Sequence, residues 1–180
     1  YKAHIVKMFQ LIGQDEKQAT KSMEAVMEIE TRLAKKSFNA VEQRNPAANY
    51  HMLTLDELKK QIPGFDWDAY INAVGVKGVT SLNVSQIEPV QEAVAIINEL
   101  PMDKQKAYLQ WKLIDSAASY LSDAFVAQNF EFYGKVMSGK KEDQPRWKKA
   151  VGTVNGVLGE AVGQMYVEKY FPAAAKERMV

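Results

Sequence analysis

The stretch Arg146–Pro172, RWKKAVGTVNGVLGEAVGQMYVEKYFP, says most about the fold. Its glycines recur at i, i+4, i+7 and i+11, a spacing that places them on one face of a single helix; they are Gly152, Gly156, Gly159 and Gly163. Apolar residues follow the same period. Each interior glycine costs a helix about 1 kcal/mol relative to alanine, but a bare glycine face lets another backbone approach closely. We therefore expect a helix that is buried against a larger structure, which lies partly outside this chain.

Helical periodicity also runs through most of residues 1–145. Capping signals mark helix starts at Asp15 and Thr54, and Ser122-Asp123 marks a restart or kink in the long helical segment 103–137. Breaks fall at Gly13-Gln14, Asn45-Pro46, Pro63-Gly64, Pro101 and Ser138-Gly139. Residues 81–84 also allow an extended conformation. The sequence predicts an all-α fold, an irregular multi-helix array without internal repeats.

The charge balance excludes some classes of partner. The chain has 23 basic and 22 acidic side chains, a formal net charge of +1. Such a balance argues against nucleic acid or an anionic membrane surface as a partner. No apolar run approaches the ~18 residues that are needed to cross a bilayer.

The chain contains no cysteine, which excludes disulfides, thiolate metal sites and cysteine nucleophiles. It opens on Tyr1, directly in an amphipathic pattern, without an initiator methionine or a signal-like segment. We therefore interpret the sequence as a piece of a longer precursor.

The residues carry no recognisable catalytic or metal-binding set. The two histidines, His4 and His51, lie in different segments without acidic neighbours at ligand spacing, so we interpret them as surface or packing residues. The motifs His-Glu-x-x-His, Gly-x-x-x-x-Gly-Lys-Ser/Thr and Gly-x-Ser-x-Gly are absent. Asp115 shares an apolar helix face with Trp111, where a carboxylate needs a partner, and a structural hydrogen bond is favoured over catalysis. We expect no catalytic and no metal-ligating residue, and substrate-binding residues stay unknown.

Several stretches together resemble the neprilysin and endothelin-converting-enzyme family of zinc metallopeptidases. The resemblance is strongest over Trp147, Val154-Asn155-Gly156 and Glu160–Glu168. Earlier stretches that fit the same family in the same order are His4-Ile5-Val6, Met27–Glu30, Arg44-Asn45-Pro46, Tyr50 with Met52–Leu55, and Trp111 with Asp115. The resemblance covers essentially the whole chain.

In that family a helical lid restricts the access of peptides to a thermolysin-like lobe that carries zinc. The resemblance implies that residues 1–140 form part of the lid and that residues 146–180 belong to the catalytic lobe, with 146–171 as the helix that crosses into it. Its four glycines would then be lobe-packing residues: Gly152, Gly156, Gly159 and Gly163. It also implies a metalloendopeptidase parent in which zinc and a glutamate general base cleave short peptides. This segment alone would hold no cofactor and be inactive, and its partners would be the remainder of the catalytic lobe and the peptide substrates of the parent.

Departures from the family pattern refine this expectation. The His-Glu-x-x-His motif and a downstream glutamate ligand are absent, so no catalytic residue is carried over to any position. Gln164 stands where familiar animal members have arginine, and the lack of cysteine differs from their cysteine-rich ectodomains, which favours a bacterial, exported relative. The alternative is a free-standing helical protein-interaction module, whose apolar grooves bind a partner helix. The isolated chain could also self-associate through its glycine face.

Overall fold

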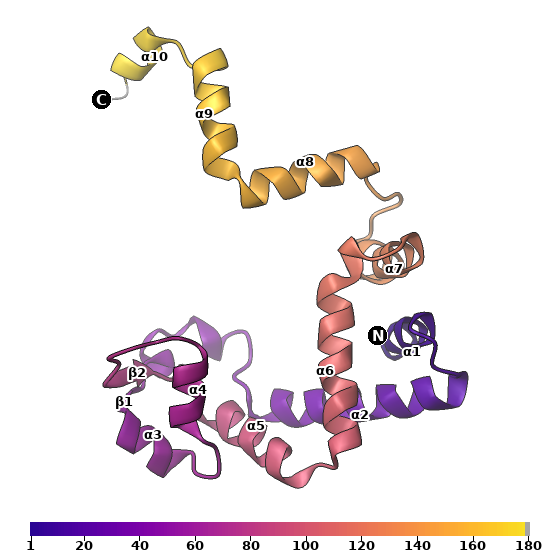
Figure 1. Cartoon of the computed structure of the whole chain (residues 1–180), viewed down its shortest axis with the longest axis vertical. Helices are drawn as coiled ribbons and strands as arrows, with labels where there is room; N and C mark the ends of the chain where they lie inside the picture. Colours follow the sequence, from indigo (N-terminus) through magenta and orange to yellow (C-terminus); the bar gives the residue numbers. More distant parts are fainter. Residues whose placement is uncertain (179–180) are drawn as a thin grey trace. The chain divides into compact units, whose positions relative to one another are not determined.

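The computed structural model describes residues 1–178, which form mostly helices (Figure 1). The α-helices are α1 (Lys2–Leu11), α2 (Glu16–Lys36), α3 (Leu55–Gln61), α4 (Trp67–Ala73), α5 (Ile87–Glu99), α6 (Met102–Ala117), α7 (Asp123–Asn129), α8 (Arg146–Val157), α9 (Gly159–Tyr170) and α10 (Ala173–Glu177). Short 3-10 helices are η1 (Glu42–Arg44), η2 (Ala47–Asn49) and η3 (Ala118–Tyr120), and η4 (Phe130–Met137) is a π-helix. The predicted multi-helix array is confirmed.

A small antiparallel sheet is added to the helices. It pairs β1 (Met52–Thr54) with β2 (Ser81–Asn83), and Leu53 lies opposite Leu82. The second strand falls within the segment 81–84 that the sequence allowed to be extended. The paired strands connect the two ends of residues 52–83, which lie between α2 and α5 in the sequence.

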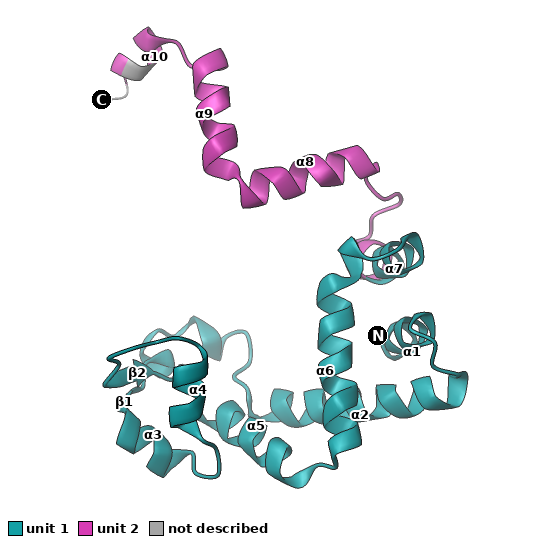
Figure 2. Cartoon of the chain, viewed as in Figure 1, with its two compact units in different colours: residues 1–132 teal, residues 133–180 magenta. Residues whose placement is uncertain are grey.

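Contacts divide the chain into two compact units, residues 1–132 and residues 133–180 (Figure 2). Unit 1 contains both strands and the helices α1 to α7, whereas unit 2 contains α8, α9 and α10. Among the described residues, no helix is both long enough and apolar enough to cross a membrane.

Helix α2 organises the main core of unit 1. The Asp15 carboxylate caps its start by accepting a hydrogen bond from the backbone N–H of Gln18, at 2.8 Å, as the sequence predicts. Helices α1, α5 and α6 pack against α2. Residues of α1, α2, α6 and η3 form this core: Ile5, Met8, Phe9, Ala19, Val26, Trp111, Ile114 and Ala118.

A second, smaller core lies under the two strands. Thr54 and Glu57 form the predicted capping box at the start of α3, and the Asp66 carboxylate caps α4 by accepting from the N–H of Ala69. The backbone and hydroxyl hydrogen bonds from Thr54 lower the pKa of Glu57. This core is built from Leu53, Leu58, Ile62, Val84 and Val94.

The long helical segment of unit 1 restarts where the sequence predicts. Helix α6 ends at Ala117, η3 follows, and Ser122 is the N-cap residue of α7. Helix α7 packs against α1 and η3. The kink therefore returns the chain to α1, and it brings α1, α6 and α7 together around one cluster of side chains.

Candidate functional site

The glycine-bearing stretch 146–171 forms two helices, so the prediction of a single helix is wrong. Helix α8 ends at Val157 and α9 begins at Gly159, with Leu158 between them at φ −119° and ψ 31°. Glycine is a poor helix former, and Gly156 and Gly159 flank the break. Neither helix has a buried residue, so tertiary packing does not offset this low propensity. The four glycines consequently do not share one continuous helix face.

All four predicted lobe-packing glycines are uncovered in the part of the chain that the structure describes. A Cβ atom built at Gly152, Gly156, Gly159 or Gly163 meets no other described atom within 4 Å. Large apolar side chains of the same two helices are exposed as well, among them Val151, Val154, Val157, Leu158 and Met165. Contiguous exposed apolar side chains mark an interaction surface, and lobe packing by the glycines stays a prediction.

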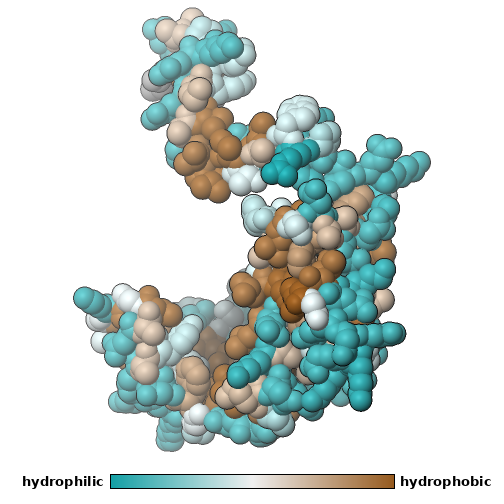
Figure 3. Space-filling view, turned by 45° about the vertical axis from the view of Figure 1, so that its right-hand side comes forward, coloured by the Kyte–Doolittle hydropathy of each residue, from teal (hydrophilic) through white to brown (hydrophobic). Residues whose placement is uncertain are grey.

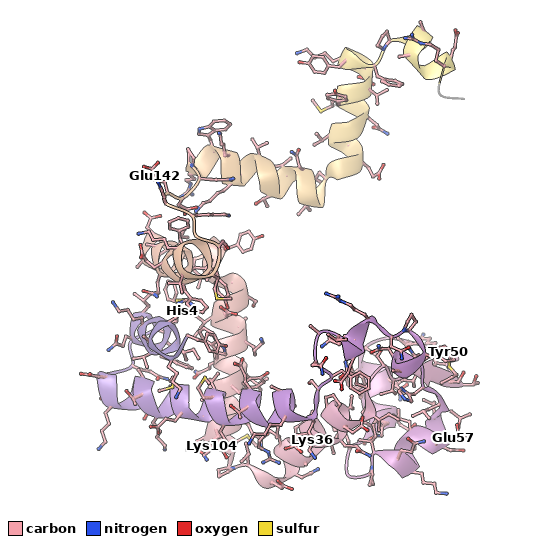
Figure 4. The ribbon with its side chains drawn as sticks, turned by 180° about the vertical axis from the view of Figure 1, so that it is seen from behind. His4, Lys36, Tyr50, Glu57, Lys104 and Glu142 are labelled. Atoms are coloured by element: carbon pink, nitrogen blue, oxygen red, sulfur yellow. The ribbon has the colours of Figure 1, made fainter. Side chains whose placement is uncertain are left out.

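A buried histidine lies where α1, α6 and α7 meet (Figure 4). His4 is 3% exposed, stacks on the Phe132 ring with centroids 4.7 Å apart, and meets the Trp111 ring edge-on at 5.6 Å. Its Nδ1 lies 3.1 Å from Nε2 of Gln128 on α7. In this contact the amide nitrogen of Gln128 is the donor and Nδ1 of His4 is the acceptor. Nε2 lies 4.0 Å from Oδ1 of Asp115 on α6.

The carboxylate of Asp115 is thus partly shielded and faces a histidine. Its side chain is 20% exposed, less protected than the apolar residues beside it. The 4.0 Å approach to His4 is longer than a hydrogen bond, so the structural hydrogen bond that the sequence predicts for Asp115 stays a prediction. A catalytic site needs a nucleophile, a base and access to substrate, whereas this pair lies inside a packed junction of three helices.

Sequence reasoning missed a second polar chain in the same junction. The indole N–H of Trp111 donates to the Tyr1 hydroxyl at 3.1 Å, and that hydroxyl donates to Glu30 of α2 at 2.8 Å. Trp111 itself is fully buried. For His4, the sequence did contain a signal of burial: His4 precedes Met8 by one helical turn, which places it on the buried face of α1. Both chains link neighbouring helices, so we interpret their role as structural.

Ion pairs fasten α2 to α5 and α6 along its length. The Arg32 guanidinium contacts Glu92 at 2.5 Å and Glu99 at 2.9 Å, and these hydrogen bonds raise the pKa of Arg32. Lys104 of α6 contacts Glu28 at 2.5 Å (Figure 4). Acidic residues of these helices therefore serve helix packing.

The described residues do not fit a zinc ion. No group of three or more His, Cys, Asp or Glu side chains that could hold a metal occurs among residues 1–178. His51 lies far from His4 in sequence, and its Nδ1 is 3.1 Å from the Val84 carbonyl oxygen. Unit 1 does contain an open apolar groove of about 470 Å³, lined in part by Phe65, Trp67 and Tyr70.

Comparison with known proteins shows which proteins this chain is similar to in sequence. The chain is 30% identical over 167 residues to human membrane metallo-endopeptidase-like 1, which covers 86% of this chain and 21% of that protein. It is 25% identical over 181 residues to Neprilysin-11 of Caenorhabditis elegans, which covers 97% of this chain and 21% of that protein. The chain therefore spans about a fifth of the length of these relatives.

A solved structure matches the fold as a whole. The zinc metalloprotease Zmp1 of Mycobacterium tuberculosis, in its open state, superposes with a TM-score of 0.90 at 32% identity, over 99% of this chain and 28% of that chain. The same protein with a bound inhibitor gives a TM-score of 0.90 at 31% identity, over 99% of this chain and 27% of that one. The resemblance stated from the sequence is confirmed, because the model of peptidase family M13 matches residues 1–180. The chain belongs to peptidase family M13.

Proposed function

We propose that this chain is a non-catalytic segment of a zinc metalloendopeptidase that cleaves short peptides, and that it contributes the size-selecting lid and lobe packing. The observation that supports this most is the likeness of nearly the whole chain to Zmp1, a zinc metalloprotease.

The proposal assigns zinc and bond cleavage to the remainder of the polypeptide. The described residues offer no ligand set for a metal, and their buried polar groups tie helices together. Unit 1 has two apolar cores and ion pairs along α2. These features suit a rigid lid that limits, by its shape, the access of peptides to the catalytic lobe.

In this proposal residues 1–140 form the lid portion, and residues 146–180 belong to the catalytic lobe. The uncovered glycines of α8 and α9 support the second part, because a Cβ-free surface with exposed apolar neighbours suits close packing on another lobe. The remainder of the catalytic lobe and peptide substrates would be the partners. We further propose that the parent is exported, to the periplasm or the cell envelope.

A peptide-length series tests the proposal. The longer polypeptide that contains this chain and its continuation would be incubated with zinc and with peptides that embed one cleavable sequence in increasing lengths. We expect fast hydrolysis of short peptides, a steep fall with length, and loss of activity with a chelator. Equal rates for a short peptide and for the same sequence in an unfolded protein would refute the lid. A reading frame without a zinc motif after residue 180 would instead favour a helical protein-interaction module.

A further inference from the structure

Helix α6 carries two apolar stripes on opposite faces. The inner stripe contains Ala107, Trp111, Ile114 and, in η3, Ala118, and it is buried in the core of unit 1. The outer stripe, about 180° away at 100° per residue, contains Met102, Leu109 and Leu113 of α6, and it continues to Tyr120 in η3. These four side chains are between 63% and 74% exposed. A helix that is apolar on both faces is normally covered on both.

The outer α6 stripe has the spacing of a helix-packing seam. Its members recur at i, i+7, i+11 and i+18, the alternation of seven and four residues that two packed helices share. The stripe is roughly 25–30 Å long. In Figure 3 apolar side chains reach the surface in the part of unit 1 that contains α6.

Charge around the outer stripe has one sign. Lys106 lies about 40° to one side of its centre and Lys112 about 80° to the other, and both are exposed. The two carboxylates of α6 lie elsewhere: Asp103 contacts Lys21 at 3.1 Å, and Asp115 faces His4. The flanks of the stripe are therefore basic on both sides.

We propose that the outer α6 stripe binds an amphipathic helix with acidic flanks, contributed by the part of the M13 polypeptide outside these 180 residues. The inference rests on the proposed function, since relatives are four to five times longer than this chain. A second copy of the chain fits poorly, because its outer stripe carries the same basic flanks and offers no acidic side chain to pair with Lys106 or Lys112. An extended peptide fits poorly too, because a helix face offers no main-chain groups to pair with it.

Two designed helical peptides of about 20 residues test this. Both carry leucine at the seven-and-four spacing; one has glutamate on both flanks and the other lysine, and their helicity is matched by circular dichroism. Fluorescence anisotropy with the whole 180-residue chain measures binding. We expect the glutamate peptide to bind about tenfold more tightly than the lysine peptide, and more weakly as salt increases. The double variant Lys106→Glu/Lys112→Glu should reverse this preference.

The apolar seam needs its own variants. Leu109→Asp/Leu113→Asp should weaken binding of the glutamate peptide at least about tenfold, without changing the denaturation midpoint, because both side chains are exposed. Val41→Asp, at another exposed apolar residue, is the matched control and should bind as the parent chain does. Absence of binding, equal binding of both peptides, or binding unaffected by the leucine changes overturns the proposal. A chain dimer that the leucine changes dissociate would assign the stripe to a second copy. None of these readouts uses peptidase activity, so they fail independently of the proposed function.

Discussion

Replacing Gly156 by alanine should stabilise helix α8 in this chain. Gly156 is the last residue but one of the helix, and a built Cβ atom meets nothing within 4 Å among the described residues. No clash therefore opposes the gain in helix propensity, which is at most about 1 kcal/mol for glycine to alanine. Adding Gly152→Ala, inside the helix and equally open, should contribute about 1 kcal/mol more.

Far-UV circular dichroism and amide hydrogen exchange over residues 146–157 measure this effect. We expect higher helicity and slower exchange in both variants. Gly139→Ala is the matched control in the same unit: its Cβ also meets open space, but its φ of +66° disfavours alanine. It should not stabilise the chain. If Gly156→Ala lowered the protection of α8, the glycine face would be packed within this chain and our description of it as uncovered would be wrong.

The same position should respond in the opposite way in the longer polypeptide. If the glycine face packs on the catalytic lobe, Gly156→Leu places a bulky side chain in a close backbone contact and should lower the melting temperature of the whole protein. A longer polypeptide that Gly156→Leu stabilises would contradict lobe packing at this face.

Three further predictions concern unit 1. Trp111→Ala should lower the free energy of unfolding by about 3–5 kcal/mol in chemical denaturation, because the side chain is fully buried. Trp147→Ala, at an exposed position, should change the free energy of unfolding by less than about 0.5 kcal/mol. Similar losses in the two variants would contradict the assignment of Trp111 to the core. Arg32→Met should destabilise the chain by about 1–3 kcal/mol, since it leaves a shielded carboxylate without its partner, and clearly more than Lys21→Met at an exposed pair. The lowered pKa of Glu57 means that its contribution to α3 is present above the unfolded pKa and is lost as pH falls through the folded one; the protection factors of the α3 amides, corrected for the pH dependence of intrinsic exchange, should therefore fall below about pH 4.5, and Glu57→Ala should remove that dependence.

Local signals predicted unit 1 well, because its helices are set by caps and by apolar spacing. Asp15 and Thr54 cap the helices that follow them, and the restart at Ser122 lies where the pattern changes. These features depend on residues a few positions apart. His4 escaped a firm assignment because its burial depends on α6 and α7, more than 100 residues away in sequence.

The stretch 146–171 shows where periodicity is insufficient. The spacing of its glycines fits one helix, but spacing does not report whether a helix has the packing to remain continuous. Neither α8 nor α9 has a buried residue, so packing does not offset the low helix propensity around Gly156 and Gly159, and the helix breaks at Leu158. The outer stripe of α6 was hidden for the converse reason, since a helix that is apolar on two faces gives a weak amphipathic pattern.

The division of labour between this chain and the remainder of its polypeptide is the central claim, and zinc content with peptide hydrolysis tests it most directly. The 180-residue chain and the longer polypeptide would each be stripped with a chelator, exposed to zinc, desalted, and assayed for bound metal and for cleavage of one short peptide. The account predicts about one zinc per molecule and cleavage for the longer polypeptide, and neither for the 180-residue chain. One tightly held zinc or measurable cleavage in the 180-residue chain would contradict it.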